Sequence, residues 1–280
     1  MRNTRYGFLV LLSSLLMLTG CSRRDILDDY PVSGVEISLD WNGVTNKLPE
    51  GVRVIFYPKN AEGRKIDTYL SVKGGKVKVP PGRYSVVVYN YDTETVQIRG
   101  EEAYETIEAF TGHCNGLGIA GTEQLVWGPD PLYVVRIDDL KIENSEEELQ
   151  LNWKPKLVVK TYSFKLKVQG LEYVSSIVGS IEGMSSCYDL GLGCGKAGDS
   201  PIYFAARGSA GEVTGSFTVF GTSEGVISRA GNAIKLTLAF VKTDNKVQKM
   251  EVDITEVIAN SESGGSGGDD DGDEPFKEIE

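Results

Sequence analysis

The sequence has 280 residues, with 29 basic and 40 acidic side chains, a single histidine and four cysteines. Its formal net charge of −11 disfavours binding to nucleic acid and to anionic lipid headgroups, because both are negatively charged. One histidine excludes a zinc site built from several histidine ligands. The length allows one large domain or two ordinary ones, each able to bury its own core.

The first residues have the pattern of a secretory leader. A short basic segment, residues 1–5, precedes a largely apolar run over residues 7–18 that is too short to span a bilayer, which needs about 20 apolar residues. The run ends in Leu-Thr-Gly-Cys, which matches a bacterial lipobox. We therefore predict a signal peptide over residues 1–20 and lipid attachment at Cys21. An ordinary signal peptide followed by an incidental cysteine is the alternative.

A lipid on Cys21 would hold the protein at a membrane surface without threading it through. Each buried methylene contributes about 0.8 kcal/mol, so two or three acyl chains together hold a protein stably where one does not. Residues 21–34 would then form the lipidated N-terminus and a polar stalk. Loss of the leader with its two arginines lowers the net charge from −11 to −13.

The other three cysteines raise the question of a disulfide. Cys187 and Cys194 flank a glycine-containing segment, and an oxidising envelope permits a bond between them across a turn. Free buried thiols are an equally good interpretation. Cys114 has no partner by this reasoning, so the sequence leaves the pairing open.

Alternating apolar and polar residues predict antiparallel β structure from Val35 onward. The clearest segment is residues 162–169, in which apolar side chains fall on one face and polar side chains on the other. Residues 84–89 are apolar on both faces, which predicts a central strand buried on two sides. Apolar residues spaced by three to four predict one short helix over 101–110. Further strands are predicted over residues 52–57, 234–240 and 250–254.

These segments predict an all-β fold with two tandem antiparallel β-sandwich domains. An acidic stretch over 143–153 separates two groups of strands, and we place the boundary just after it. The last residues are rich in glycine and acids, a composition that cannot bury enough apolar surface to fold. The predicted units are an N-terminal sandwich over 35–155, a C-terminal sandwich over 156–258 and a disordered acidic tail over 259–280.

The motifs that would indicate chemistry are weak. His113 adjoins Cys114, but neighbours on a strand point to opposite faces, and a nucleophile and its base must converge. Residues 116–121 match the dinucleotide pattern G-x-G-x-x-G, yet prolines soon after would stop the helix that such a site needs. The neighbouring acids Asp138 and Asp139 are typical of a solvated turn. We predict no catalytic residue, no cofactor and no metal site.

A series of motifs in a fixed order resembles the fimbrillin-like lipoproteins of Bacteroidales. The resemblance is closest to the group that contains the anchor subunits of major and minor fimbriae, together with an uncharacterised sister family of gut Bacteroides. The resemblance covers residues 18–258, and the order of the motifs along the chain is more specific than any one motif. The motifs are the lipobox, VRVIFYPKNAEG, VPPGRYSVVVYNYDTETVQIRG, GPDPLYV, YSFKLKVQGLEYVSSIVGSIEGMSSCYDL, GSFTVFG and VDITEVI.

The resemblance implies two transthyretin-like sandwiches, export to the outer membrane and a place in a fibre that assembles by strand complementation between subunits. In such a fibre, a sandwich that lacks one strand offers an edge and a groove to a partner's strand. Family members that polymerise lose their first strand to an arginine- or lysine-specific protease. Lys47 and Arg53 are basic candidates here, although nothing singles out either one. The polar tail is a poor donor strand, which favours an anchor over a stalk subunit.

The predicted function is that of a structural anchor or accessory subunit of a fimbria-like surface fibre, with a part in adhesion. Two other functions are alternatives to it. A surface lipoprotein that captures glycan for uptake would need exposed aromatic side chains spaced to stack on sugar rings, and Trp41, Trp127 and Trp153 are the candidates. A hydrolase would need His113 or a pair of acids in a cleft.

Overall fold

The computed structural model confirms the all-β class. Strands make up most of the described chain, and a single turn of 3₁₀ helix, η2 (Leu171–Tyr173), and one α-helix lie between or after them. Cys21, most of the predicted stalk and the glycine pattern at 116–121 lie outside the described residues. The described residues are 33–60, 63–114, 124–197, 200–221, 233–263 and 277–279.

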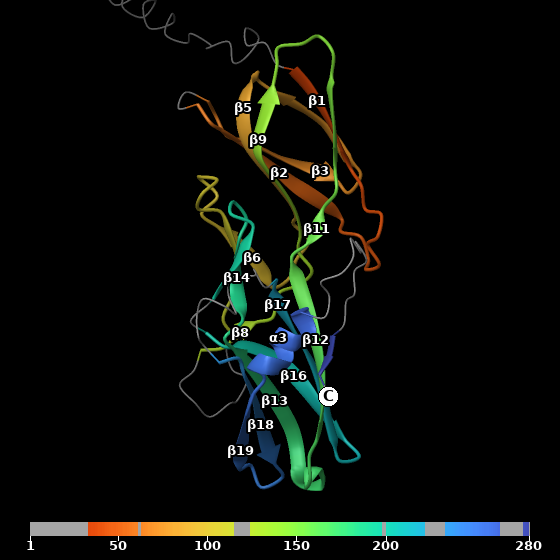
Figure 1. Cartoon of the computed structure of the whole chain (residues 1–280), viewed down its shortest axis with the longest axis vertical. Helices are drawn as coiled ribbons and strands as arrows, with labels where there is room; N and C mark the ends of the chain where they lie inside the picture. Colours follow the sequence, from red (N-terminus) through yellow and green to blue (C-terminus); the bar gives the residue numbers. More distant parts are fainter. Residues whose placement is uncertain are drawn as a thin grey trace, which may run out of the picture.

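Sheet A occupies the upper end of the molecule in Figure 1 and has the strand order β10-β1-β4-β3-β2-β5-β9-β11. Neighbouring strands are antiparallel except β1 and β10, which are parallel. In chain order the strands are β1 (Ser33–Leu39), β2 (Gly51–Pro58), β3 (Ile66–Ser71), β4 (Gly74–Val79), β5 (Gly82–Asn90), β9 (Tyr133–Ile142), β10 (Leu149–Trp153) and β11 (Lys156–Leu157).

Sheet C occupies the lower end and has the strand order β19-β18-β13-β16-β17-β12-β20. A short strand, β8, pairs in parallel with the start of β16, at Ile202 and Tyr203, whereas β17 pairs with the end of β16. The strands are β8 (Val126–Trp127), β12 (Val159–Lys167), β13 (Val174–Glu182), β16 (Ile202–Ser209), β17 (Glu212–Phe220), β18 (Lys235–Lys242), β19 (Val247–Asp253) and β20 (Lys277–Ile279).

Sheet B lies between the other two and joins the two halves of the chain (Figure 1). Its order is β15-β14-β7-β6. Strands β6 (Val96–Arg99) and β7 (Glu108–Thr111) come from the first half, whereas β14 (Ser185–Asp189) and β15 (Cys194–Ala197) come from the second. The two halves therefore share a sheet, which the boundary drawn after residue 155 did not foresee.

The passage from sheet A to sheet C occurs at Val158. Strand β11 follows the expected boundary yet still pairs with β9 of sheet A, and β12 begins sheet C at Val159. The amide of Val158 donates to Leu132 O at 2.9 Å, and its carbonyl accepts from the amide of Gly221 at 2.6 Å. Val158, between β11 and β12, is thus hydrogen-bonded beside β9 of sheet A and beside β17 of sheet C.

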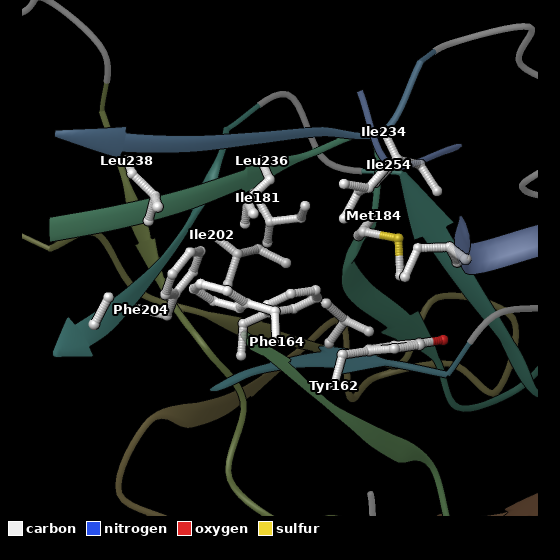
Figure 2. Packing of buried hydrophobic residues seen from close by; sticks show 14 of the residues in the cluster. Tyr162, Phe164, Ile181, Met184, Ile202, Phe204, Ile234, Leu236, Leu238 and Ile254 are labelled. Atoms are coloured by element: carbon white, nitrogen blue, oxygen red, sulfur yellow. The ribbon is translucent and has the colours of Figure 1, made fainter. Parts of the chain in front are cut away.

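Three buried clusters stabilise the arrangement. The upper core joins β1, β4 and β10 to β2, β5 and β9, so sheet A folds over on itself. The lower core fills sheet C and includes Phe164, Ile181, Phe204 and Leu238 (Figure 2). The junction core draws residues from all three sheets, which makes the two halves one packed unit.

Strand β5 confirms the expectation of a strand buried on both faces. Val86 and Val88 are in the upper core, whereas Val87 and Tyr89 are in the junction core, and all four are at most 2% exposed. Alternate residues point to opposite faces of a sheet, so an apolar run belongs where both faces are covered.

The prediction of a helix over residues 101–110 is wrong. Residues 101–106 form successive turns, in which Thr106 Oγ1 donates to Gly100 O at 2.7 Å, and β7 follows. Ile107 and Ala109, two residues apart, are both fully buried in the junction core. Burial at a spacing of two outweighed the helical spacing of the wider stretch.

The region expected to be a disordered tail differs from that expectation at two places. Helix α3 (Thr255–Ser263) extends past residue 259, and Ile254 and Ile258 beside and within it are buried in the lower core. Figure 2 shows Ile254 beside Met184 at this end of the core. Residues Lys277–Ile279 then form β20 on the edge of β12. Backbone pairing needs no alternating side chains, so the composition of the tail did not predict it.

Candidate functional site

Cys21, the predicted lipid attachment site, lies outside the described residues, and its lipidation stays a prediction. Within the described residues, no helix has the length and apolar character that crossing a bilayer requires. The same residues hold no group of three or more histidine, cysteine or acidic side chains arranged for a metal ion.

Cys187 and Cys194 lie on neighbouring strands of sheet B as free thiols. Cys187 faces Lys196 and Cys194 faces Asp189, so the two cysteines are diagonal to each other. Diagonal positions lie about 7–8 Å apart, and a disulfide requires Cα atoms closer than about 7 Å. A bond between them would thus need a small shift of the strands, and it stays a prediction.

A prediction for these thiols follows from their surroundings. Burial and the nearby Glu108 carboxylate raise the pKa of the Cys187 thiol, which therefore stays protonated at neutral pH and reacts slowly. We expect mass spectrometry of the purified protein to show slower alkylation of Cys187 than of a thiol exposed by unfolding. A mass lower by two hydrogens, with neither cysteine alkylated after unfolding, would instead establish the disulfide.

His113 and Cys114 do not form a nucleophilic pair. His113 is exposed and makes an isolated bridge to Val126, while Cys114 is partly buried. Burial raises the pKa of the Cys114 thiol to about 11, which leaves little thiolate at neutral pH. Neither residue has the activated environment that a catalytic site requires.

Asp138 and Asp139 form a β-bulge and not the turn that we expected. Both lie within β9, and the register to β5 shifts at this point, so the two acids lie opposite Ser85. Ser85 Oγ donates to Asp138 O at 2.8 Å. Asp138 accepts from Arg136, and Asp139 forms an ion pair with Arg83. Each carboxylate thus has its own partner, and the pair does not converge on a cleft.

The tryptophans provide no flat sugar platform. Trp153 is 8% exposed, and Trp41 Nε1 donates to Val72 O at 2.6 Å while its ring packs edge-on against Tyr133. Trp127 is 37% exposed, but its ring is perpendicular to that of Tyr203. The more exposed pair is Tyr69 and Tyr91, whose rings also meet edge to face at 78°. Rings that meet edge to face share no plane, so none of these pairs offers a sugar one flat surface built from two aromatic rings.

Arg53 is the centre of a network that sequence reasoning missed. It lies within β2, and its guanidinium binds Asp67 of β3 through Nε at 2.9 Å and Nη2 at 2.7 Å. The same group donates to both carboxylate oxygens of Glu101, at 2.5 and 2.9 Å, and to Tyr89 Oη at 2.8 Å. Its side chain is 17% exposed. The signal was present in the sequence as an arginine inside an otherwise apolar strand.

This network bears on the two basic residues considered for proteolysis. A protease needs an extended, accessible segment, but Arg53 is in the middle of a strand that pairs with β3 and β5, and its side chain is held by two acids. Lys47 is exposed in the segment between β1 and β2. Of the two, Lys47 is better placed for cleavage.

The carboxylates in these networks predict a loss of stability in acid. The hydrogen bond from Arg53 lowers the pKa of Asp67. Burial alone would raise the pKa of Glu108, but the hydrogen bonds from Arg99 and Lys196 have the larger effect, so the pKa of Glu108 is also lowered. A carboxylate whose pKa is lower when folded stabilises the fold above about pH 4 and loses this effect as pH falls further. We expect the thermal midpoint to fall between about pH 5 and about pH 3. An unchanged midpoint across this range would contradict the ion pairing.

The edges of a β-sheet are the surfaces where another strand can add. Sheet A ends at β10 and β11, sheet B at β15 and β6, and sheet C at β19 and β20. The β12 side of sheet C is distinctive, because β20, a segment more than 100 residues further along the chain, pairs with β12 there. Strand β20 runs parallel to β12 and pairs at Tyr162–Phe164. Strand addition to an edge is thus a feature of this structure itself.

Comparisons with known proteins identify close relatives. A family described as "Domain of unknown function (DUF5119)" matches residues 20–205. A protein named "Putative fimbrium anchoring subunit Fim4B" from Bacteroides ovatus is 63% identical over 281 residues, which cover 96% of this chain and 84% of the relative.

Solved structures of fimbrial and adhesin-like proteins are also similar to this chain. The crystal structure of a "putative adhesin" from Bacteroides ovatus has a TM-score of 0.80 and 58% identity, with 93% of each chain covered. The fimbrial anchor protein Mfa2 from Porphyromonas gingivalis has a TM-score of 0.54 and 12% identity, and the match covers 81% of this chain and 84% of that one. At 12% identity, the similarity to Mfa2 shows a shared fold alone.

Proposed function

Because this chain belongs to the fimbrillin-like family that includes fimbrial anchor subunits, and to the family described as "Domain of unknown function (DUF5119)", we propose that it anchors a fimbria-like fibre to the outer membrane. The relatives are structural proteins, and this chain is a structural protein and not an enzyme. The observation that carries the proposal is the 63% identity to a fimbrium anchoring subunit over 96% of the chain.

The attachment itself is assigned to Cys21. The lipobox ends at this residue, and Ser33, where β1 begins, follows it by only a short stretch of chain. Two or three acyl chains on Cys21 would hold the folded domains close to the membrane surface. Among the described residues, the exposed aromatic pairs Tyr69–Tyr91 and Trp127–Tyr203 meet edge to face and form no shared flat surface, so the alternative of glycan capture has less support than anchoring.

Fractionation of cells tests the lipid attachment. We expect the natural protein to sediment with the outer membrane and to require detergent for release. Its mass should exceed that of the chain starting at Cys21 by a diacylglyceryl group, with or without a further acyl chain. The Cys21→Ser variant lacks the acceptor thiol and should lose both properties. Cys114→Ser, which removes a partly buried cysteine elsewhere, is the matched control and should stay in the membrane. A Cys21→Ser protein that still needs detergent for release would contradict the assignment.

The fibre partner would dock by strand complementation. A fibre subunit's extended segment would gain main-chain hydrogen bonds along an exposed edge strand, and pockets beside the edge would select its side chains. In this arrangement the anchor keeps its lipid and ends the fibre at the membrane. Adhesion would then depend on the whole fibre held at the surface.

A further inference from the structure

A lysine-lined groove lies where the chain passes from β11 of sheet A to β12 of sheet C (Figure 1). Lys154 follows β10, Lys156 begins β11 and Lys160 is the second residue of β12, and all three are exposed. These three residues, the groove lysines, line one groove of about 690 Å³. Positions of an extended chain that are separated by even numbers of residues share one face. The passage between the two sheets therefore has a row of ammonium groups along it.

The groove is positive although the chain as a whole is acidic. Among the described residues, its lining contains four basic residues, which are the groove lysines and Arg136, and one acidic residue, Asp138. Asp138 and Arg136 form an ion pair, so their charges cancel and the lining keeps an excess of three positive charges. The complete chain has a formal net charge of −11. The chemistry that fits a row of separate positive charges is a peptide with several acidic side chains.

The chain itself contains such a peptide at a matching position. Residues 269–274 have the sequence Asp-Asp-Asp-Gly-Asp-Glu, with five acids and no base. They come shortly before β20, which runs parallel to β12 with Lys277 opposite Tyr162. Asp271 precedes Lys277 by six residues, and Lys156 precedes Tyr162 by the same number. Because parallel strands advance together, the register of β20 directs the acidic segment towards the groove lysines.

The chain is held on both sides of the acidic segment. Before it, helix α3 ends at Ser263, and Ile258 within this helix is buried in the lower core. After it, β20 pairs with β12. A short segment tethered in this way has an effective concentration in the millimolar range at a site within its reach. A single exposed ion pair stabilises little, but several together suffice for a segment that is already tethered.

We propose that this groove is a binding site for acidic peptides and that residues 269–274 of the same chain occupy it. Ion pairs with the groove lysines then extend the contact of the tail from β12 of sheet C to β11 of sheet A. An acidic segment of another protein has to compete with the tail for the same lysines. The proposal rests on the charges and the register of this chain, so it is independent of the proposed fimbrial function.

Carbodiimide cross-linking of the natural chain tests the occupancy. The reagent joins an amine to a carboxylate that contacts it, and mass spectrometry of the digested monomer identifies the joined residues. We expect residues 269–274 to be joined to the groove lysines about tenfold more often than to Lys78 or Lys249, which are also exposed but lie on β4 and β19. Salt at about 1 M, where the Debye length is about 3 Å, should lower this yield. Equal joining to the groove and control lysines, or none to the groove lysines, would overturn the proposal.

A peptide titration tests the site apart from its occupant. The probe is a labelled synthetic peptide with the sequence of residues 268–276. The neutral-tail variant is the complete chain with Asp→Asn at positions 269, 270, 271 and 273 and Glu274→Gln. We expect the probe to bind this variant about tenfold more tightly than the natural chain, whose groove is filled by the tail. Equal binding to the two chains, or no binding to the neutral-tail variant in the millimolar range, would contradict the proposal.

Two sets of lysine replacements control for the change in net charge. In the neutral-tail variant, glutamine at all three groove lysines should abolish binding of the probe. Lys73→Gln, Lys78→Gln and Lys249→Gln together change the net charge equally at exposed positions outside the groove and should leave binding unchanged. The same loss of binding in both sets would mean that the probe responds to overall charge, and the groove would not be its site.

Discussion

We expect the Arg53→Met variant to lose about 3 kcal/mol of unfolding free energy, because it leaves two carboxylates and a buried tyrosine hydroxyl without their common donor. Methionine keeps the apolar stem and removes the fork of nitrogen donors that matches two carboxylates. Chemical unfolding monitored by tyrosine and tryptophan fluorescence measures the change. The network joins β2 and β3 to Glu101 in the turns before β7, so its loss weakens the contact between sheets A and B.

The control for this variant is Arg83→Met. Arg83 also pairs with an aspartate, Asp139, but its side chain is 61% exposed, so water replaces the pair when it is lost. We expect no resolvable change in the unfolding free energy of this variant. If the two variants were equally stable, the Arg53 network would be an ordinary surface feature and its central role would be wrong.

Replacing Phe220 by alanine should lower the unfolding free energy by about 3–5 kcal/mol. Phe220 is fully buried and belongs to β17 of sheet C, yet it is part of the junction core with Ile55 and Val87 of sheet A. A cavity here therefore loosens the contact between the halves as well as sheet C itself. Differential scanning calorimetry should show a thermal midpoint lowered by about 10 °C.

Phe240→Ala distinguishes coupling from simple loss of packing. Phe240 is also buried, but it belongs to the lower core and lines the pocket at the far end of sheet C. Hydrogen exchange should quicken in β2 and β5 of the Phe220→Ala variant and stay unchanged there in Phe240→Ala. Similar exchange of β2 and β5 in both variants would mean that the halves do not stabilise each other.

The sequence predicted the individual strands better than their assembly. The strands around residues 52–57, 84–89 and 162–169 were identified because side chains alternate or are apolar on both faces, which is a local signal. Sheet B depends on pairing between β7 and β14, more than seventy residues apart, and neither strand contains a signal that names its partner. The shared sheet, and with it the junction core, could not be foreseen from local patterns.

The candidate sites divide in the same way. Cys21 was predicted from the sequence alone, because a lipobox is a contiguous motif, and its lipidation stays a prediction. Arg53 was considered for proteolysis, and its real partners, Asp67 and Glu101, come together through folding. Strand β20 was overlooked because the acids around it dominate the composition, whereas its pairing with β12 depends on the backbone.

The retention of fibres on cells tests anchoring most directly. In cells whose natural gene is replaced by the Cys21→Ser form, fibre subunits should move from the outer membrane to the culture medium, while total fibre protein stays constant. Cells carrying Cys114→Ser should retain their fibres. Immunoblotting of membrane and medium for the fibre's main subunit gives the ratio. Fibres that stay attached to Cys21→Ser cells to the same degree as in the control would contradict the role of this chain as their lipid-linked anchor.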